Sequence, residues 1–288
     1  MTTYAIGDVR GSLQTLVNLL DTIKFDQQQD TLWFTGNLVN GGSESLAVLR
    51  FVRELGKQAV TVLGNQELRL LGIADSVIAS AAEDTFSEIL SATDRDVLLK
   101  WLCQRPFLHH EMNFTLVHAG IPAEWSLSQA QTFAMEAEST LAFGNRKAFL
   151  ENIFADDPTR WHAKHRGWKR VRFITNAFTR MRYCNDIGRL DFSTEGTHGS
   201  PPEGYVPWYG LNDRAMAKQN IIFGHWPLIE NNRLANEESE NKGRSNNTPG
   251  LFPLNSADTQ SNMLCAMKVC STPETFNVPW NSMFPGIE

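Results

Sequence analysis

A strand, a glycine-containing loop and a helix follow one another three times near the start of this chain, and this repeat constrains the fold more than any other feature. Residues 4–6, 31–35 and 58–63 are short apolar runs typical of strands, and each precedes apolar residues at helical spacing. This alternation is typical of an α/β sheet, in which ligands bind beyond the carboxyl ends of the strands. We therefore expect the three glycine-containing loops at one edge of a sheet.

The remainder of the chain mixes helices with later strands. Helical spacing predicts helices at 86–104, 127–143 and 146–154, whereas 113–117 and 221–223 read as strands that run into histidine-containing loops. The later strands are therefore expected to bring further polar side chains to the edge that the early strands define.

Three further segments of the chain have weaker patterns. Residues 171–175 are apolar and expected to be extended, and 263–269 read as a late strand. The segment 230–250 is rich in Asn, Glu and Ser, which predicts a mobile loop. Because no internal repeat or linker is visible, we predict one domain over residues 1–288 with a helical insertion at about 75–170.

The composition excludes several classes of function. A formal net charge of −6 disfavours nucleic-acid binding through a basic surface. No run approaches the roughly 18 apolar residues that cross a bilayer, so we expect no membrane association, and the first residues lack the pattern of a secretory signal. The 4 cysteines form no Cys-x-x-Cys pair, which predicts reduced thiols and a cytoplasmic protein.

Polar side chains of a particular kind stand at the predicted strand ends. Aspartate, asparagine and histidine are ligand types for hard or borderline divalent cations. Here they are accompanied by an arginine and a glutamine, and the whole set is Asp8 with Arg10, Asn37, Asn65 with Gln66, His118, and His225.

The order and spacing of these loops resemble those of the calcineurin-like metallophosphoesterases. The surrounding sequence is similar to that of the bacterial symmetrical diadenosine tetraphosphatases. The resemblance covers about residues 1–230, and the stretches 116–120, 173–182 and 223–226 carry most of it. It implies a β-sandwich flanked by helices, an α/β fold with two ions of the manganese, cobalt or zinc type. It also implies symmetrical hydrolysis of dinucleoside tetraphosphates into nucleoside diphosphates.

Within this resemblance, only part of the metal-ligand set is preserved. Asp8, Asn65, His118 and His225 match family ligands, whereas Asn37 occupies the place of the bridging aspartate. A neutral amide lacks the charge that holds two dications together.

Three further positions depart from the family pattern. Arg10 occupies the place of a ligand histidine, and its guanidinium has no lone pair for a cation. Gln66 occupies the place of the catalytic histidine, and an amide cannot act as a general acid. Gly41 occupies the place of a phosphate-binding arginine.

Charge counting then predicts the metal content. Two dications beside Arg10, with Asp8 as the remaining carboxylate among these loops, would strongly repel one another at low dielectric. We therefore expect no two-metal cluster, and none or at most one weakly bound divalent ion, at Asn65, His118 and His225.

The arginines allow more than one interpretation. Arg10 either pairs with Asp8 or supplies charge to a bound phosphate, and Arg180 and Arg182 either contact phosphate or are solvated. Likewise, the Trp208-Tyr209 pair either stacks on an adenine or belongs to the core.

These observations predict a degenerate homologue of the symmetrical diadenosine tetraphosphatases, inactive or very weakly active, that can retain nucleotide or polyphosphate binding. The alternative is an active metal-dependent hydrolase that cuts diadenosine tetraphosphate into two ADP with a reduced metal site. The expected ligand is an adenine dinucleotide or another polyphosphate. The sequence identifies neither a protein partner nor an oligomeric state.

Overall fold

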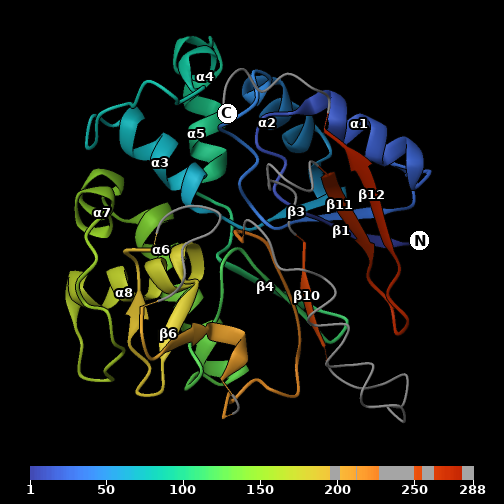
Figure 1. Ribbon diagram of the computed structural model, residues 1–288. Helices are drawn as coiled ribbons and strands as arrows, with labels where there is room; N and C mark the ends of the chain where they lie inside the picture. The colour runs from blue at the N-terminus through green and yellow to red at the C-terminus, as the bar shows by residue number, and fades with distance from the viewer. Residues whose placement is uncertain (195–201, 212, 227–249, 255–262, 281–288) are drawn as a thin grey trace.

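Two mixed β-sheets, with helices outside them, form the body of the molecule (Figure 1). The computed structural model describes residues 1–194, 202–211, 213–226, 250–254 and 263–280. The predicted loop at 230–250 therefore lies almost wholly outside the described residues.

The first sheet contains the strands of the early strand–loop–helix repeats. Its order is β12-β11-β1-β2-β3. β1 (Thr3–Ile6), β2 (Thr31–Phe34) and β3 (Ala59–Thr61) run parallel, as the repeats predict. β11 (Met263–Lys268) and β12 (Thr275–Pro279) add an antiparallel edge.

The second sheet carries the later strands, in the order β10-β9-β5-β4. β9 (Asn220–Phe223) is parallel to both β5 (Phe114–Val117) and β10 (Leu251–Pro253), and β4 (Leu108–Glu111) is antiparallel to β5. A small third sheet has the order β7-β6-β8 and consists of β6 (Tyr183–Asn185), β7 (Leu190–Asp191) and β8 (Tyr205–Pro207).

The alternation of side chains along the strands joins the two large sheets into a sandwich. Ala5 and Trp33 point to one face and pack with Leu116 and Ile222 of the second sheet. Neighbouring residues such as Phe34 point to the opposite face and join the core shared with the helices. Because successive strand residues alternate between faces, both faces of the central strands β1, β2, β5 and β9 are buried, and the predicted β-sandwich is confirmed.

The first three helices each follow one of the parallel strands. α1 (Leu13–Thr22), α2 (Ser45–Glu54) and α3 (Asn65–Ala74) come after connections of 6, 10 and 3 residues from β1, β2 and β3. Short 3₁₀ turns occupy Gly56–Gln58 and Trp208–Gly210. α1 packs on β11 and β12, on the outer face of the first sheet.

The later helices form two groups. α4 (Ser87–Ser91) and α5 (Arg95–Leu102) contact α2 and each other. α6 (Leu127–Phe143), α7 (Arg146–Ile153) and α8 (Gly167–Arg180) pack on one another, and α6 contacts β4 of the second sheet. The predicted insertion at 75–170 therefore contains β4 and β5 as well as helices. Within the described part of the chain, no helix has both the length and the apolarity needed to cross a membrane.

Two sequence-based assignments in this region are wrong. The single helix predicted at 86–104 is two helices, because Ala92 has an extended backbone (φ −67, ψ 143) and Asp94 binds Arg50 with both carboxylate oxygens. The strand predicted at 171–175 lies inside α8. A window of five residues is too short to tell a strand from a helix, whereas over the whole of α8 the buried residues Val171, Ile174 and Phe178 recur at helical spacing.

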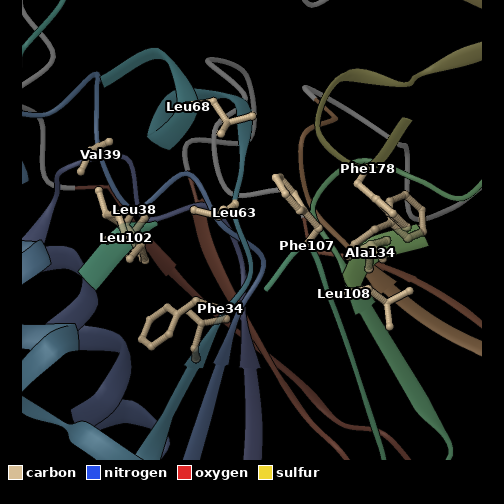
Figure 2. Packing of buried hydrophobic residues seen from close by; sticks show 14 of the residues in the cluster. Phe34, Leu38, Val39, Leu63, Leu68, Leu102, Phe107, Leu108, Ala134 and Phe178 are labelled. Atoms are coloured by element: carbon tan, nitrogen blue, oxygen red, sulfur yellow. The ribbon is translucent and has the colours of Figure 1, made fainter. Parts of the chain in front are cut away.

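The helices and the first sheet share one hydrophobic core. Figure 2 shows Phe34, Leu38 and Leu63 on one side of this cluster and Phe178 with Ala134 on the other. Phe178 stacks on Phe107 with ring centroids 6.5 Å apart. This packing connects α8 to the segment that precedes β4.

Truncation of Phe178 tests the importance of this packing. Because Phe178 is fully buried, Phe178→Ala should lower the free energy of unfolding by about 3–5 kcal/mol, which is the cost of a large core cavity. Urea denaturation followed by circular dichroism measures the change. The matched control is Phe143→Ala at a side chain that is 87% exposed, and equal losses in the two variants would contradict the assignment of Phe178 to the core.

Candidate functional site

The strand ends bring the predicted polar residues together from both sheets. Asp8, Asn37 and Asn65 follow the parallel strands β1, β2 and β3, and His118 and His225 follow β5 and β9. Hydrogen bonds link all five residues into one group. The prediction that these loops meet at one place is therefore confirmed.

The backbone at this place adopts conformations that most side chains avoid. Arg10, Asn37 and His225 have positive φ angles of 49°, 48° and 65°. Gly224 is required by a close approach, since a Cβ there would lie 2.2 Å from Asp8 Oδ1. Such strain persists where surrounding structure holds it, and it gathers at functional sites.

His118, Asn65 and His225 form an acceptor-rich cluster. The His118 Nδ1–H donates to the Thr35 carbonyl at 2.7 Å, so the neutral ring keeps its lone pair on Nε2. That Nε2 lies 3.1 Å from Asn65 Oδ1 and 3.2 Å from His225 Nδ1. Three potential ligand atoms from three strand ends thus converge on one point.

Both histidines of this cluster are held in the neutral form. Burial lowers the pKa of His118 to about 4, against a smaller opposing effect of Glu67. The pKa of His225 lies well below its usual value, because of burial first and the Arg182 charge second. Neutral imidazole is the ligand form of histidine, and a backbone carbonyl behind the other ring nitrogen is the usual support of a metal-bound ring. Asn65, His118 and His225 therefore fit one divalent ion.

The other half of the predicted metal site is closed by hydrogen bonds within the protein. Asp8 accepts from Thr35 Oγ1 at 2.9 Å, from Asn37 Nδ2 at 3.1 Å and from the His225 N–H at 3.4 Å. Asn37 Oδ1 accepts from the Gln66 N–H at 3.0 Å. Asn37 thus directs its nitrogen, and not its oxygen, towards Asp8. Asp8 and Asn37 do not fit a second ion in this arrangement.

The surroundings of Asp8 also act on its ionisation. Burial raises the pKa of Asp8 to about 6, and the Thr35 hydrogen bond and the Arg10 charge only partly oppose this effect.

Glu67 is a residue whose role sequence reasoning did not assign. Its Oε2 accepts from the N–H groups of Asn37 and Gly64, both at 2.9 Å, and its Oε1 accepts from the Leu38 N–H at 2.7 Å. The carboxylate thereby fixes the loops after β2 and β3. Its position three residues after the residue that caps α3 is a capping-box signal that could have indicated this role. Because both oxygens are used, Glu67 does not substitute for a lost ligand.

Arg180 and Arg182 come from the end of α8 and the residues after it, and they line a cavity of about 220 Å³. Asn65 and His225 line the same cavity. Arg182 donates to the His225 carbonyl at 2.9 Å, and Arg180 pairs with Asp156 at 2.8 Å. The structure therefore brings both arginines to the histidine cluster.

Arg10 acts on this site through its charge. Its backbone N–H donates to the Asn37 carbonyl at 2.8 Å, which holds the first loop against the second. Its positive charge lowers the pKa of Asp8. Among the ion pairs of the described ranges, none joins Arg10 to Asp8 within 4.0 Å. A direct Arg10–Asp8 contact pair, one of the two interpretations from sequence, is not formed.

Gln66 belongs to a polar network that supports the loop after β2. Its Oε1 accepts from Asn40 Nδ2 at 2.8 Å, and the same Asn40 nitrogen lies 3.0 Å from Asp84 Oδ1. Arg69 binds Asp84 with two hydrogen bonds of 2.8 and 2.7 Å. This network fixes the Gln66 side chain on the wall of the site.

The remaining aromatic candidate belongs to the core. Trp208 is 1% exposed, and its Nε1–H donates to the Ala119 carbonyl at 3.1 Å. Tyr209 packs against Phe223 and Trp226. The structure therefore favours a core role for this pair over stacking on an adenine.

A sandwich of two mixed sheets, with asparagine and histidine side chains that converge at the strand ends, is typical of a metallophosphoesterase fold. A family model described as calcineurin-like phosphoesterase matches residues 1–225. The chain therefore belongs to the calcineurin-like phosphoesterases. Within them, it belongs to the family of symmetrical bis(5'-nucleosyl)-tetraphosphatases.

The curated relatives match most of the chain. A symmetrical bis(5'-nucleosyl)-tetraphosphatase from Methylococcus capsulatus is 49% identical over 229 residues, which are 80% of this chain and 82% of that protein. Its counterpart from Thioalkalivibrio sulfidiphilus is 44% identical over 80% of this chain and 86% of that protein. The crystal structure of a candidate diadenosine tetraphosphatase superposes with a TM-score of 0.59 at 20% identity, over 97% of this chain and 94% of that one.

These comparisons confirm the family and the fold that the sequence predicts. The family uses divalent metal ions, and the curated relatives are named as hydrolases. Nothing in them indicates that activity is lost in this chain. The expectation of an inactive homologue thus receives no support from the relatives, and the alternative of a metal-dependent hydrolase agrees with them better.

The network behind Gln66 leads to a pH-dependent prediction. The Arg69 hydrogen bonds lower the pKa of Asp84, although burial opposes them. Since a depressed folded-state pKa stabilises the fold above the unfolded-state value, Asp84→Asn should cost about 2 kcal/mol of stability at pH 7. This difference should vanish as the pH falls through the folded-state pKa of Asp84. Urea denaturation at several pH values measures it.

The matched control for this prediction is Asp94→Asn, which breaks the same kind of bidentate arginine pair on a more exposed surface. We expect a smaller loss there, because solvent screens exposed pairs. Equal losses at Asp84 and Asp94, or a loss at Asp84 that does not change with pH, would contradict the buried network.

Proposed function

We propose that this chain hydrolyses dinucleoside tetraphosphates symmetrically into two nucleoside diphosphates, with one divalent ion held by Asn65, His118 and His225. The observation that carries this proposal is the convergence of three potential ligand atoms. Oδ1 of Asn65 lies 3.1 Å and Nδ1 of His225 lies 3.2 Å from Nε2 of His118. The names of the relatives that share 44–49% identity support the choice of substrate.

The residues around this cluster have distinct tasks in the proposal. A divalent ion bound there would supply Lewis-acid charge and a more acidic water. Arg180 and Arg182 would bind phosphoryl oxygens and hold the chain of phosphates in one orientation, as forked guanidinium donors do. Gln66 can donate a hydrogen bond to a leaving oxygen but cannot deliver a proton. We therefore expect slow turnover, since general acid catalysis contributes roughly 10²–10⁴-fold.

A second candidate function is binding of the same ligand without turnover. It is favoured by the hydrogen bonds that close the Asp8–Asn37 half of the site and by the Asn40–Gln66 pair. Both place neutral amides where hydrolysis would benefit from a second ion or an acid. A turnover assay separates the two candidates.

The first test combines metal analysis with turnover. Protein loaded with Mn²⁺ should hold about one ion per chain and release ADP alone from diadenosine tetraphosphate, because the three donor atoms fit one ion. His118→Ala should lose both properties, whereas His162→Ala, at an exposed histidine, should lose neither. ADP release that does not depend on His118 would contradict the proposal, and metal binding without ADP release would favour the second candidate.

A rescue variant tests why the site holds one ion. Arg10→His, Asn37→Asp and Gln66→His together should raise the metal content from about one to about two ions per chain, because they restore the missing carboxylate and ligand imidazole. Gly41 is left unchanged, since its φ of 112° would strain an arginine. Mass spectrometry of the dialysed protein measures the content. A content that stays at one ion would show that the loops have also changed shape.

A further inference from the structure

Three arginines near the histidine cluster have buried guanidinium N–H groups without acceptors. Within the described ranges, Arg10 Nε, Arg180 Nη1 and Arg182 Nε are buried and have no hydrogen-bond partner. Arg180 and Arg182 line the cavity of about 220 Å³ that also contacts Asn65 and His225. A buried donor without an acceptor is unfavourable, so such donors point to a ligand that brings acceptor atoms.

Arg10 is electrostatically part of the same group. Its charge lowers the pKa values of both Arg182 and His118, and it lowers that of Asp8. The Arg10 backbone is held in place, because its carbonyl accepts from the Gly42 N–H at 2.7 Å. Because its Nε is also buried, Arg10 places a positive charge inside the protein near the cluster and not at the exposed surface.

The carboxylates near these arginines already have other partners. Arg180 has Asp156 as an ion-pair partner, whereas the acceptor of Arg182 is the uncharged carbonyl of His225. Asp191 lines the same cavity, but its oxygens accept from Ser193 and Thr194. Within the described ranges, no ion pair within 4.0 Å joins Arg10 or Arg182 to a carboxylate.

We propose that Arg10, together with Arg182, binds phosphoryl oxygens of a polyphosphate directly, so that Arg10 replaces one of the two metal ions of the family and binding does not require a divalent ion. The guanidinium supplies fixed charge and directed donors, which a phosphate accepts in a bidentate manner. This inference rests on the proposed function only for the class of ligand. It concerns binding in the absence of metal, which the hydrolysis assay does not measure.

Calorimetry on the full chain after chelator treatment tests the inference. With excess EDTA present, diadenosine tetraphosphate and inorganic tripolyphosphate should bind, and Arg10→Gln should weaken both by at least tenfold, as expected for loss of a charge-assisted hydrogen bond. Arg10→Lys keeps the positive charge but lacks the paired N–H donors of a guanidinium. Its affinities should lie between those of the parent protein and those of Arg10→Gln. Both Arg10 variants are first shown to be folded by thermal unfolding.

The control is Arg53→Gln, which removes the same charge from an exposed position on α2. It should leave both affinities within twofold of the parent protein. Equal weakening by Arg53→Gln would mean that net charge alone binds the phosphates. Absence of binding in EDTA, or unchanged affinity in Arg10→Gln, would overturn the inference.

The outcomes also separate this inference from the proposed function. Binding in EDTA that depends on Arg10, without ADP release in Mn²⁺, would support the arginine site and reject hydrolysis. ADP release in Mn²⁺ without binding in EDTA would reject the arginine site and leave hydrolysis standing. Binding of tripolyphosphate equal to that of diadenosine tetraphosphate would show that the phosphates, and not the adenosines, are recognised.

Discussion

The Glu67 carboxylate is the interaction on which the rest of the site depends. It accepts three backbone N–H groups from the loops after β2 and β3, and this fixes the positions of Asn37 and Asn65. Asn37 then orients Asp8, and Asn65 lies against His118. Because the Glu67 carboxylate is buried and joins these two loops, one side chain sets the geometry at the ends of β2 and β3, and Asn37 extends its effect to Asp8.

The two halves of the site differ in what they offer a ligand. At Asn65, His118 and His225, acceptor atoms converge and both imidazoles are neutral, so the fit is to a cation. Around Arg10 and Arg182, buried donors lack acceptors, so the fit is to a group that brings acceptor atoms, such as an anion. A polyphosphate bound together with one divalent ion would satisfy both halves at once. Its phosphoryl oxygens would accept from the arginines, and the ion would occupy the histidine cluster.

Much of this arrangement could be predicted from the chain alone. The strand–loop–helix repeats identified β1, β2 and β3 and the edge where their loops meet, since strand and helix periods are local properties. The wrong assignments were also local. The window 171–175 was too short to show the helical spacing that α8 has over its full length, and Ala92 interrupts a helix whose spacing continues beyond it. The roles of Glu67, Asn40 and Asp84 escaped prediction, because their partners lie far away along the sequence.

The sequence by itself determined the family, the strand ends that carry the site and the chemistry of each replacement, such as a guanidinium at Arg10. Only the tertiary structure decided how these replacements are used. Asn37 turns its nitrogen towards Asp8 while the ligand atoms of His118 and His225 still converge. Residue types fix which bonds a side chain is able to make, whereas the packing of distant loops fixes which of those bonds are already made within the protein.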